Sequence, residues 1–207
     1  SCAAEVFEAR LRAMQQDAVQ TTHAQAALNV LKALNEQLDV LKAELEALAE
    51  AEEAYERLCS MPGVKLIVSL AFIAALDDPG RFKNAHQVEA FLGLVPGESS
   101  TGGKRRLGAI TKVGNSMARS LLIQAAHTLL RMRRCEADPL VIWAKQVAER
   151  RGKRVAAVAL ARRLAGILWA MWVDGTFYDA KGLGRASANG LSRRARRAQQ
   201  EAAEMRR

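Results

Sequence analysis

The chain has 207 residues, of which half are apolar and about a quarter are charged, and this balance excludes a chain that is disordered throughout. Its formal net charge of +9 predicts a polyanionic partner. The charge is unevenly divided, because residues 1–58 carry −6 and the other 149 residues carry +15, so we expect the two parts to have different roles.

Cysteine and hydropathy patterns narrow the class of protein. The three cysteines are widely spaced and lack a Cys-x-x-Cys pair, which indicates neither a disulfide framework nor a zinc site and fits a reducing cytoplasm. The longest apolar run, residues 155–173, is interrupted by Arg162 and Arg163. We therefore expect no membrane span and no membrane partner.

Residues 1–58 are predicted to form a helical arm. Residues 3–60 contain no Gly and no Pro, so they predict one long helix, or two helices with a break near Thr21 and Thr22. Leucines recur there at alternating spacings of three and four residues, as in a heptad seam: Leu31, Leu34, Leu38, Leu41, Leu45 and Leu48. This narrow stripe predicts a coiled-coil or helical-hairpin arm, and we favour a coiled coil that joins copies of the chain in a homo-oligomer. The alternative, a helix packed on its own globular domain, would show a wider apolar stripe.

Met-Pro-Gly-Val at residues 61–64, followed by an apolar run, resembles a helix-hairpin-helix turn, whose backbone amides can hold a DNA phosphate. Lys65 stands where that motif usually has its second glycine. A plain turn between two helices, leading into a buried helix, is the open alternative.

Capping signals divide the region 59–180 into further helices. Asn84 is expected to cap a short helix, and Asp138 with Pro139 is expected to begin a helix that ends near residues 150–152. Residues 154–174 are apolar almost all round and predict the central core helix.

The segment 93–122 holds the candidate site. It places adjacent hydroxyls beside glycines and a run of cations, the side-chain types that handle a phosphodiester: Ser99, Ser100, Thr101, Gly102, Gly103, Lys104, Arg105 and Arg106. The flanking Pro-Gly and Gly-Gly pairs predict a tight exposed turn or a short hairpin. A nucleotide-binding P-loop is excluded, because in that motif Lys directly follows the second glycine and precedes Ser or Thr.

A strong helix is predicted from residue 116 to about residue 134. Its apolar face is expected to carry four residues: Met117, Leu121, Ala125 and Leu129. Free amides and the positive dipole end near Gly114 favour a bound phosphate. We therefore predict nucleic-acid contacts at Lys112, Asn115 and Arg119, which lie at the start of this helix.

The C-terminal residues 181–207 predict a basic tail. Six arginines fall within residues 192–207, in a background of Gly, Ala and Ser. Such a tail is expected to become helical on a nucleic acid. A tail that only increases solubility is the alternative. In outline, we predict a mainly all-α fold with a coiled-coil arm at 1–58, a compact helical domain at 59–180 and this tail.

Six blocks around the candidate site resemble the C-terminal transposase domain of the insertion-sequence family one-ten. This family comprises the bridge-RNA-guided serine recombinases and includes the Piv invertase. The blocks occur in order over about 65 residues, and they are residues 61–64, 78–84, 91–96, 100–108, 110–115 and 121–126.

The resemblance implies a catalytic serine that attacks a DNA phosphodiester and holds the strand as a phosphoserine ester. It places this serine at Ser100, with Ser99 as the second candidate. It also implies that Lys104, Arg105, Arg106 and Lys112 bind the phosphate, that DNA and a guide RNA are partners, and that the coiled coil joins subunits.

Family members also carry an RuvC-like N-terminal domain with four acidic metal ligands. Residues 1–58 are predicted as helical arm, so the chain resembles a C-terminal portion of such a protein. We expect no cofactor or metal in this chain, Mg²⁺ only in the RuvC-like domain, and no cleavage by the chain alone. Two other functions stay open: a non-catalytic module for nucleic-acid binding and dimerisation, and a helical scaffold for protein partners.

Overall fold

The computed structural model describes residues 18–98 and 107–180, with the side chains of 25–98 and 108–180. The chain divides into two compact units, Ser1–Leu48 and Ala49–Arg207. Helices dominate both units and the only sheet among the described residues has two strands, so the mainly all-α prediction is confirmed.

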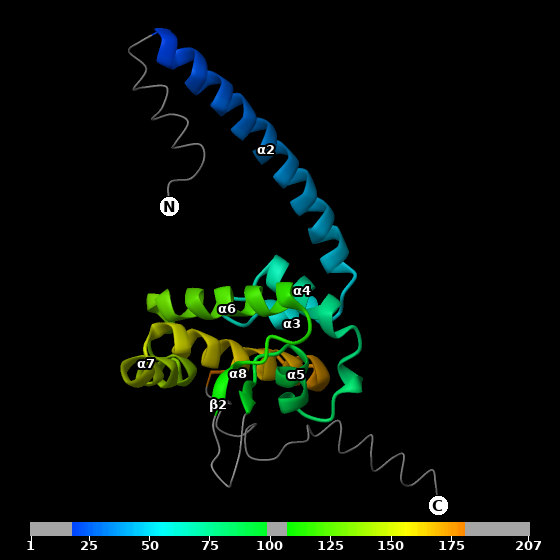
Figure 1. The fold of residues 1–207 in the computed structure, drawn as a ribbon. Helices are drawn as coiled ribbons and strands as arrows, with labels where there is room; N and C mark the ends of the chain where they lie inside the picture. The colour runs from blue at the N-terminus through cyan, green and yellow to red at the C-terminus, as the bar shows by residue number, and fades with distance from the viewer. Residues whose placement is uncertain (1–17, 99–106, 181–207) are drawn as a thin grey trace, which may run out of the picture. The chain divides into compact units, whose positions relative to one another are not determined.

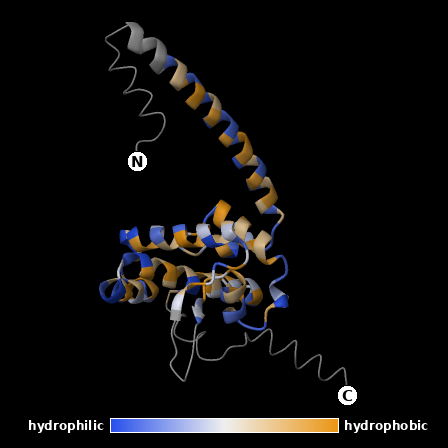
Figure 2. Cartoon of the chain, viewed as in Figure 1, coloured by the Kyte–Doolittle hydropathy of each residue, from blue (hydrophilic) through white to orange (hydrophobic). Residues whose placement is uncertain are grey.

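The first unit contains most of one long helix, α2 (Ala18–Glu50) (Figure 1). It runs unbroken past Thr21 and Thr22, so one of the two predicted forms of the arm is found and the break is not. A helix of 33 residues extends for about 50 Å. Apolar residues recur along this helix (Figure 2).

The helix ends earlier than the sequence predicted, at Glu50, and a separate short helix, α3 (Tyr55–Cys59), follows. Ala54 is 2% exposed and Leu58 is fully buried, and both belong to the core of the second unit. Helix propensity alone favoured continuation to residue 60. Burial of these two side chains explains why the chain turns instead.

The second unit is built around α8 (Lys153–Asp174), as predicted. This helix packs against α5 (Ala85–Phe91), α6 (Ser116–Arg131) and α7 (Pro139–Arg151) (Figure 1). Among the described residues, α8 alone is long and apolar enough to cross a membrane, but more than half of it is buried inside this unit. Its apolar surface is therefore that of a core helix.

The turn at residues 61–64 leads into α4 (Leu66–Leu76), as both interpretations of this motif required. Met61 and Val64 are fully buried. Gly63 has φ 85°, and a Cβ at this position would lie 2.9 Å from the carbonyl oxygen of Ala125 in α6. The glycine thus has a packing role, because its missing side chain lets the turn approach α6.

Two predicted caps are confirmed. The Asn84 side chain accepts a hydrogen bond from the Gln87 amide at 3.0 Å, and that of Asp138 accepts one from the Leu140 amide at 2.8 Å. The predicted apolar face of α6 is partly wrong, since Met117 is 62% exposed. The buried face consists of Ala118, Leu122, Ala125, Ala126 and Leu129.

The predicted turn or short hairpin is a hairpin. Strand β1 (Pro96–Glu98) pairs antiparallel with β2 (Leu107–Ile110), and Pro96 lies opposite Ile110. The register shifts between Pro96 and Glu98, as at a β-bulge. Residues 99–106, which we call the serine loop, connect the strands and lie outside the described residues.

Candidate nucleic-acid interface

The predicted site divides into the serine loop and its base. The loop residues all lie outside the described part of the chain: Ser99, Ser100, Thr101, Gly102, Gly103, Lys104, Arg105 and Arg106. The structure describes the hairpin that carries the loop and the other three predicted contacts, Lys112, Asn115 and Arg119. These residues define where the loop is attached to the domain.

Very close backbone contacts join the two ends of the hairpin segment. Gly93 has φ 67°, and a Cβ there would lie 2.2 Å from the carbonyl oxygen of Val113. Gly114 has φ 79°, and a Cβ there would lie 2.0 Å from the carbonyl oxygen of Phe91. No residue with a side chain fits such approaches without displacing the backbone. Glycine at both positions therefore brings the segment after α5 against the segment before α6.

Hydrogen bonds continue this contact toward the strands. The Lys112 amide donates to the Gly93 carbonyl at 3.1 Å, and the Thr111 amide donates to the Val95 carbonyl at 2.9 Å. On the α5 side, the Leu94 amide donates to the Glu89 carbonyl at 2.9 Å. The base of the hairpin is thus bonded both across itself and back to α5.

Arg119 joins the same two segments through its side chain. Its Nη1 donates to the carbonyl oxygen of Leu92 at 3.1 Å and to that of Val113 at 3.0 Å. A charged donor shared by two carbonyls makes stronger hydrogen bonds than a neutral one. Arg119 therefore clamps the hairpin base, and its predicted contact with nucleic acid stays a prediction.

Asn115 and Lys112 differ in whether their side-chain polar groups already have a partner among the described residues. The side-chain oxygen of Asn115 accepts a hydrogen bond from the Ala118 amide at 3.0 Å and so caps α6. Lys112 has φ 57°, which is unusual for a residue with a side chain, and it is exposed without an ion pair among the described residues. Of the three described candidates, Lys112 presents the most available positive charge at the hairpin base.

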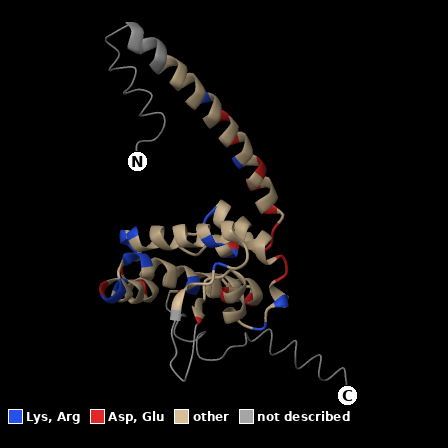
Figure 3. Cartoon of the chain, viewed as in Figure 1, with Lys and Arg blue, Asp and Glu red and all other residues tan. Residues whose placement is uncertain are grey.

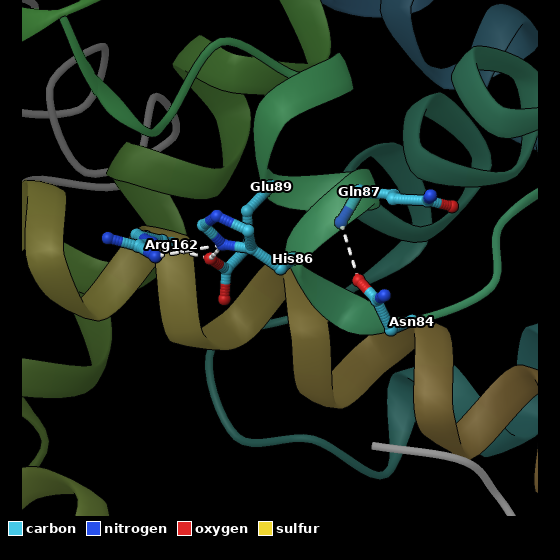
Figure 4. Close-up of polar contacts among 5 residues, drawn as sticks. All are labelled: Asn84, His86, Gln87, Glu89 and Arg162. Carbon is cyan, nitrogen blue, oxygen red and sulfur yellow. Dashed lines mark hydrogen bonds and ion pairs between the residues drawn. The ribbon is translucent and has the colours of Figure 1, made fainter. Parts of the chain in front are cut away.

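An ion pair fixes α5, and with it the hairpin, to the core helix (Figure 4). Arg162 Nε donates to Glu89 Oε2, whose side chain is only 13% exposed. Nδ1 of His86 lies 3.1 Å from this same oxygen and 3.1 Å from Arg162 Nη2. Nearby, a Cβ at Gly166 would lie 3.1 Å from the Ala85 Cβ, so glycine lets α5 approach α8 closely. The helix that leads into the hairpin is therefore held by charge and by packing.

Sequence reasoning missed this pairing. Arg162 was noted only as an interruption of an apolar run, and Glu89 lies 73 residues away from it. A charged residue within an otherwise buried helix is a general signal that it has a partner, although it does not identify the partner.

The described residues offer no evident metal site. No three His, Cys, Asp or Glu side chains within 18–98 and 107–180 are placed to hold a metal ion. The resemblance implies Mg²⁺ on a RuvC-like domain, and the side chains described within 18–98 and 107–180 form no group that fits this ion.

The predicted loop therefore connects the strands of a hairpin that has close glycine contacts at its base and is fixed to a helical core. Comparisons with known proteins show that this part of the chain is similar to transposases. Residues 55–140, from the first residue of α3 to the start of α7, match the model of the Transposase IS116/IS110/IS902 family. This segment, which carries the hairpin, is therefore similar to the domain that defines that family.

Curated relatives extend the similarity over most of the chain. It is 43% identical over 128 residues to the transposase for insertion sequence element IS1111A of Coxiella burnetii, covering 62% of this chain and 35% of the relative. It is 35% identical over 156 residues to a probable family 20 transposase of Pseudomonas aeruginosa, covering 72% and 46%. It is 32% identical over 146 residues to the transposase for insertion sequence element IS1328 of Yersinia enterocolitica, covering 70% and 44%. The chain thus spans less than half the length of these relatives.

Proposed function

We propose that this chain is the C-terminal portion of a DNA transposase in which Ser100 is the nucleophile for strand cleavage and exchange. The observation that carries the proposal is that the family domain, residues 55–140, contains both strands of the hairpin and the whole serine loop. The rigid base supports it further, since a nucleophile acts efficiently only from a fixed position.

The proposed reaction is a transesterification at phosphorus. The Ser100 oxygen forms a bond to the DNA phosphorus while the bond from phosphorus to one DNA oxygen breaks. The serine proton ends on the DNA hydroxyl that leaves, and the other strand end remains as a phosphoserine ester. Attack of a DNA hydroxyl on that ester joins the strands and restores the serine, so strand exchange needs no external energy source.

Cations near Ser100 would stabilise the phosphate in this reaction. Lys104, Arg105 and Arg106 follow the serine in the loop, and Lys112 presents an exposed ammonium at the hairpin base. Positive groups aimed at a phosphoryl transition state lower its energy more than that of the substrate. We assign these residues to phosphate binding.

The proposal includes partners outside this chain. Following the resemblance, an RuvC-like domain with Mg²⁺ would complete the active site, and a guide RNA would select the DNA. The chain alone is then expected to bind nucleic acid without cutting it.

The exposed leucines of α2 support self-association as part of the same function. Five of the six seam leucines are at least 40% exposed: Leu31, Leu34, Leu38, Leu41 and Leu48. Burying such a stripe against a second α2 in a coiled coil would remove it from water. Strand exchange between DNA sites also requires more than one active serine.

The serine assignment is tested with Ser100→Ala in the full-length transposase, with Ser99→Ala as the matched control. Ser100→Ala should abolish recombination and the covalent protein–DNA adduct while DNA affinity stays within about twofold, since a neutral hydroxyl contributes little to phosphate binding beside three cations. Ser99→Ala should retain the adduct. Normal recombination by Ser100→Ala would contradict the assignment. If neither variant nor the wild type forms an adduct, a non-catalytic nucleic-acid-binding module becomes the better explanation.

A further inference from the structure

A second group of cations lies on the compact unit, away from the hairpin. They gather where α6 ends, in the short helix η2 (Arg133–Cys135), and at the turn between α7 and α8 (Figure 3). All seven are exposed, and we call this surface the basic helix end: Arg131, Arg133, Arg134, Arg150, Arg151, Lys153 and Arg154.

Few carboxylates offset this charge. Glu136 forms an ion pair with Lys145, with 3.3 Å between Oε1 and Nζ. Asp138 is buried and accepts hydrogen bonds from Tyr178 and from the start of α7. Glu149 is the remaining acid between residues 131 and 154. The basic helix end therefore keeps a strong positive potential.

Helix stability explains only part of this cluster. Arg131 Nε donates to the His127 carbonyl and Arg150 Nε donates to the Gln146 carbonyl, so both satisfy the C-terminal end of their own helix. Lys153 and Arg154 instead lie in the first turn of α8. Cations are unfavourable at that end of a helix, because the macrodipole is positive there.

The α7–α8 turn is also open to a large partner. Gly152 joins the two helices with φ 85°, and a Cβ built on it meets no atom within 4 Å. Two cations precede this glycine and two follow it, in the order Arg-Arg-Gly-Lys-Arg. The fold thus concentrates charge at a protruding turn where it does not benefit the helix that follows.

The position of this surface can be related to the hairpin base. The hairpin base lies at the start of α6, and the basic helix end begins where α6 ends (Figure 1). The 16 residues of α6 span about 24 Å. At about 3.4 Å per base pair, that distance corresponds to about seven base pairs of duplex DNA.

We propose that the basic helix end binds the phosphate backbone of duplex DNA as a second contact, separate from the strand held at the serine loop. The inference rests on the proposed function for the presence of DNA at the loop. The charge, exposure and position of the seven cations assign a second contact that the loop itself does not provide. Its role is to fix the orientation of the DNA, because phosphate contacts set register without reading sequence.

The test compares three triple variants of the 207-residue chain, each losing three positive charges. The variant of the basic helix end is Arg151→Gln/Lys153→Gln/Arg154→Gln, and the loop variant is Lys104→Gln/Arg105→Gln/Arg106→Gln. The control changes exposed lysines elsewhere: Lys32→Gln/Lys42→Gln/Lys83→Gln. Binding to a 30-base-pair duplex is measured by fluorescence anisotropy over a range of salt concentrations.

The slope of log affinity against log salt reports phosphate contacts, at about 0.9 per contact. The basic-helix-end variant should lower the slope by about 2 to 3, and the control should lower it by less than about 0.5. The melting temperature of the basic-helix-end variant should match that of the wild type, because all three substituted side chains are exposed.

Each result decides the proposal. A slope unchanged in the basic-helix-end variant overturns it, and if the loop variant alone changes the slope, the proposed function of the loop still stands. A slope that changes with duplex RNA but not with duplex DNA also overturns it. So does a change confined to the oligomeric state in sedimentation, because the surface would then bind another copy of the chain.

Discussion

Arg119 is consistent with two roles, a contact with phosphate and a clamp of the hairpin base. From sequence it is a cation at a helix start, suited to a phosphate, whereas the structure places its Nη1 between the carbonyls of Leu92 and Val113. Only the structure reveals the second role, because the acceptors lie 27 and 6 residues away in the chain.

Replacing Arg119 by Met should loosen the hairpin base. The change removes both charged hydrogen bonds, of which the one to the Leu92 carbonyl is partly buried and the one to the Val113 carbonyl is exposed, at a cost of about 1–3 kcal/mol in unfolding free energy. Hydrogen exchange of the Thr111 and Lys112 amides should become faster, since these amides bond across the base. Arg163→Met is the control, because Arg163 belongs to α8 and its guanidinium carbon lies 3.8 Å from the centroid of the Trp143 ring in α7. Equal exchange in both variants would show that Arg119 is not a clamp.

At the scale of the elements, a polar contact joins the segment after α8 to the start of α7. Tyr178 donates its hydroxyl to Asp138 Oδ2 at 2.6 Å, and the Tyr178 amide donates to the Ser60 hydroxyl at 2.9 Å. Burial raises the pKa of the Tyr178 hydroxyl well above its usual range, and the hydrogen bond to the Asp138 carboxylate raises it further. The folded chain therefore holds this proton more tightly than the unfolded chain does.

This contact predicts a loss of stability at high pH. Because the pKa of Tyr178 is higher in the folded state, its contribution is fully present below the unfolded pKa near 10 and declines as the pH rises above it. Tyr178→Phe should lower the unfolding free energy at pH 8 and should show a shallower further decline above pH 10. Urea unfolding at pH 8, 9, 10 and 11 measures both. Parallel curves for the variant and the wild type would contradict the assignment.

Local signals predicted local features well. Asn84 and Asp138 were recognised as caps because each bonds to an amide two or three residues later, so the pattern and the contact occupy the same few residues. The core helix α8 was recognised from composition alone. The position of Met117 could not be obtained in this way, because which neighbouring stripe of α6 is buried depends on where α4 and α8 pack.

The chemistry of the candidate site could be predicted from the sequence, but the contacts that hold the hairpin in place could not. Hydroxyls, glycines and cations within a few residues indicated phosphate chemistry from sequence. The close approach of Gly93 to Val113 and of Gly114 to Phe91 required the path of the chain between α5 and α6. The Glu89–Arg162 pair required the packing of two helices, and no sequence periodicity connects residues 73 positions apart.

Across the whole molecule, the arm is the part for which we propose a partner, namely a second copy of the chain. Its described ion pairs, Lys32–Glu36 and Lys42–Glu46, are exposed contacts between residues one turn apart, and such pairs contribute little. Helices in water are otherwise stabilised mainly by packing an apolar face. Five of the six seam leucines are exposed along α2, so association through this seam would supply the missing packing.

Two pairs of substitutions on α2 test this association. Leu34 and Leu41 lie on the heptad seam, and Val30 and Val40 lie off it, yet all four side chains are between 53% and 60% exposed. Leu34→Gln/Leu41→Gln should weaken dimerisation by at least about 3 kcal/mol, or about a hundredfold, because each seam leucine buries apolar area in a coiled coil. Val30→Gln/Val40→Gln removes similar exposed apolar surface and should change the dissociation constant by less than about threefold. Sedimentation equilibrium measures both constants. If the valine pair has the larger effect, the chain associates through a different face of α2. A dissociation constant of 100 µM corresponds to a binding free energy of roughly 5 kcal/mol. A wild-type chain that stays monomeric at this concentration would therefore exclude the coiled coil.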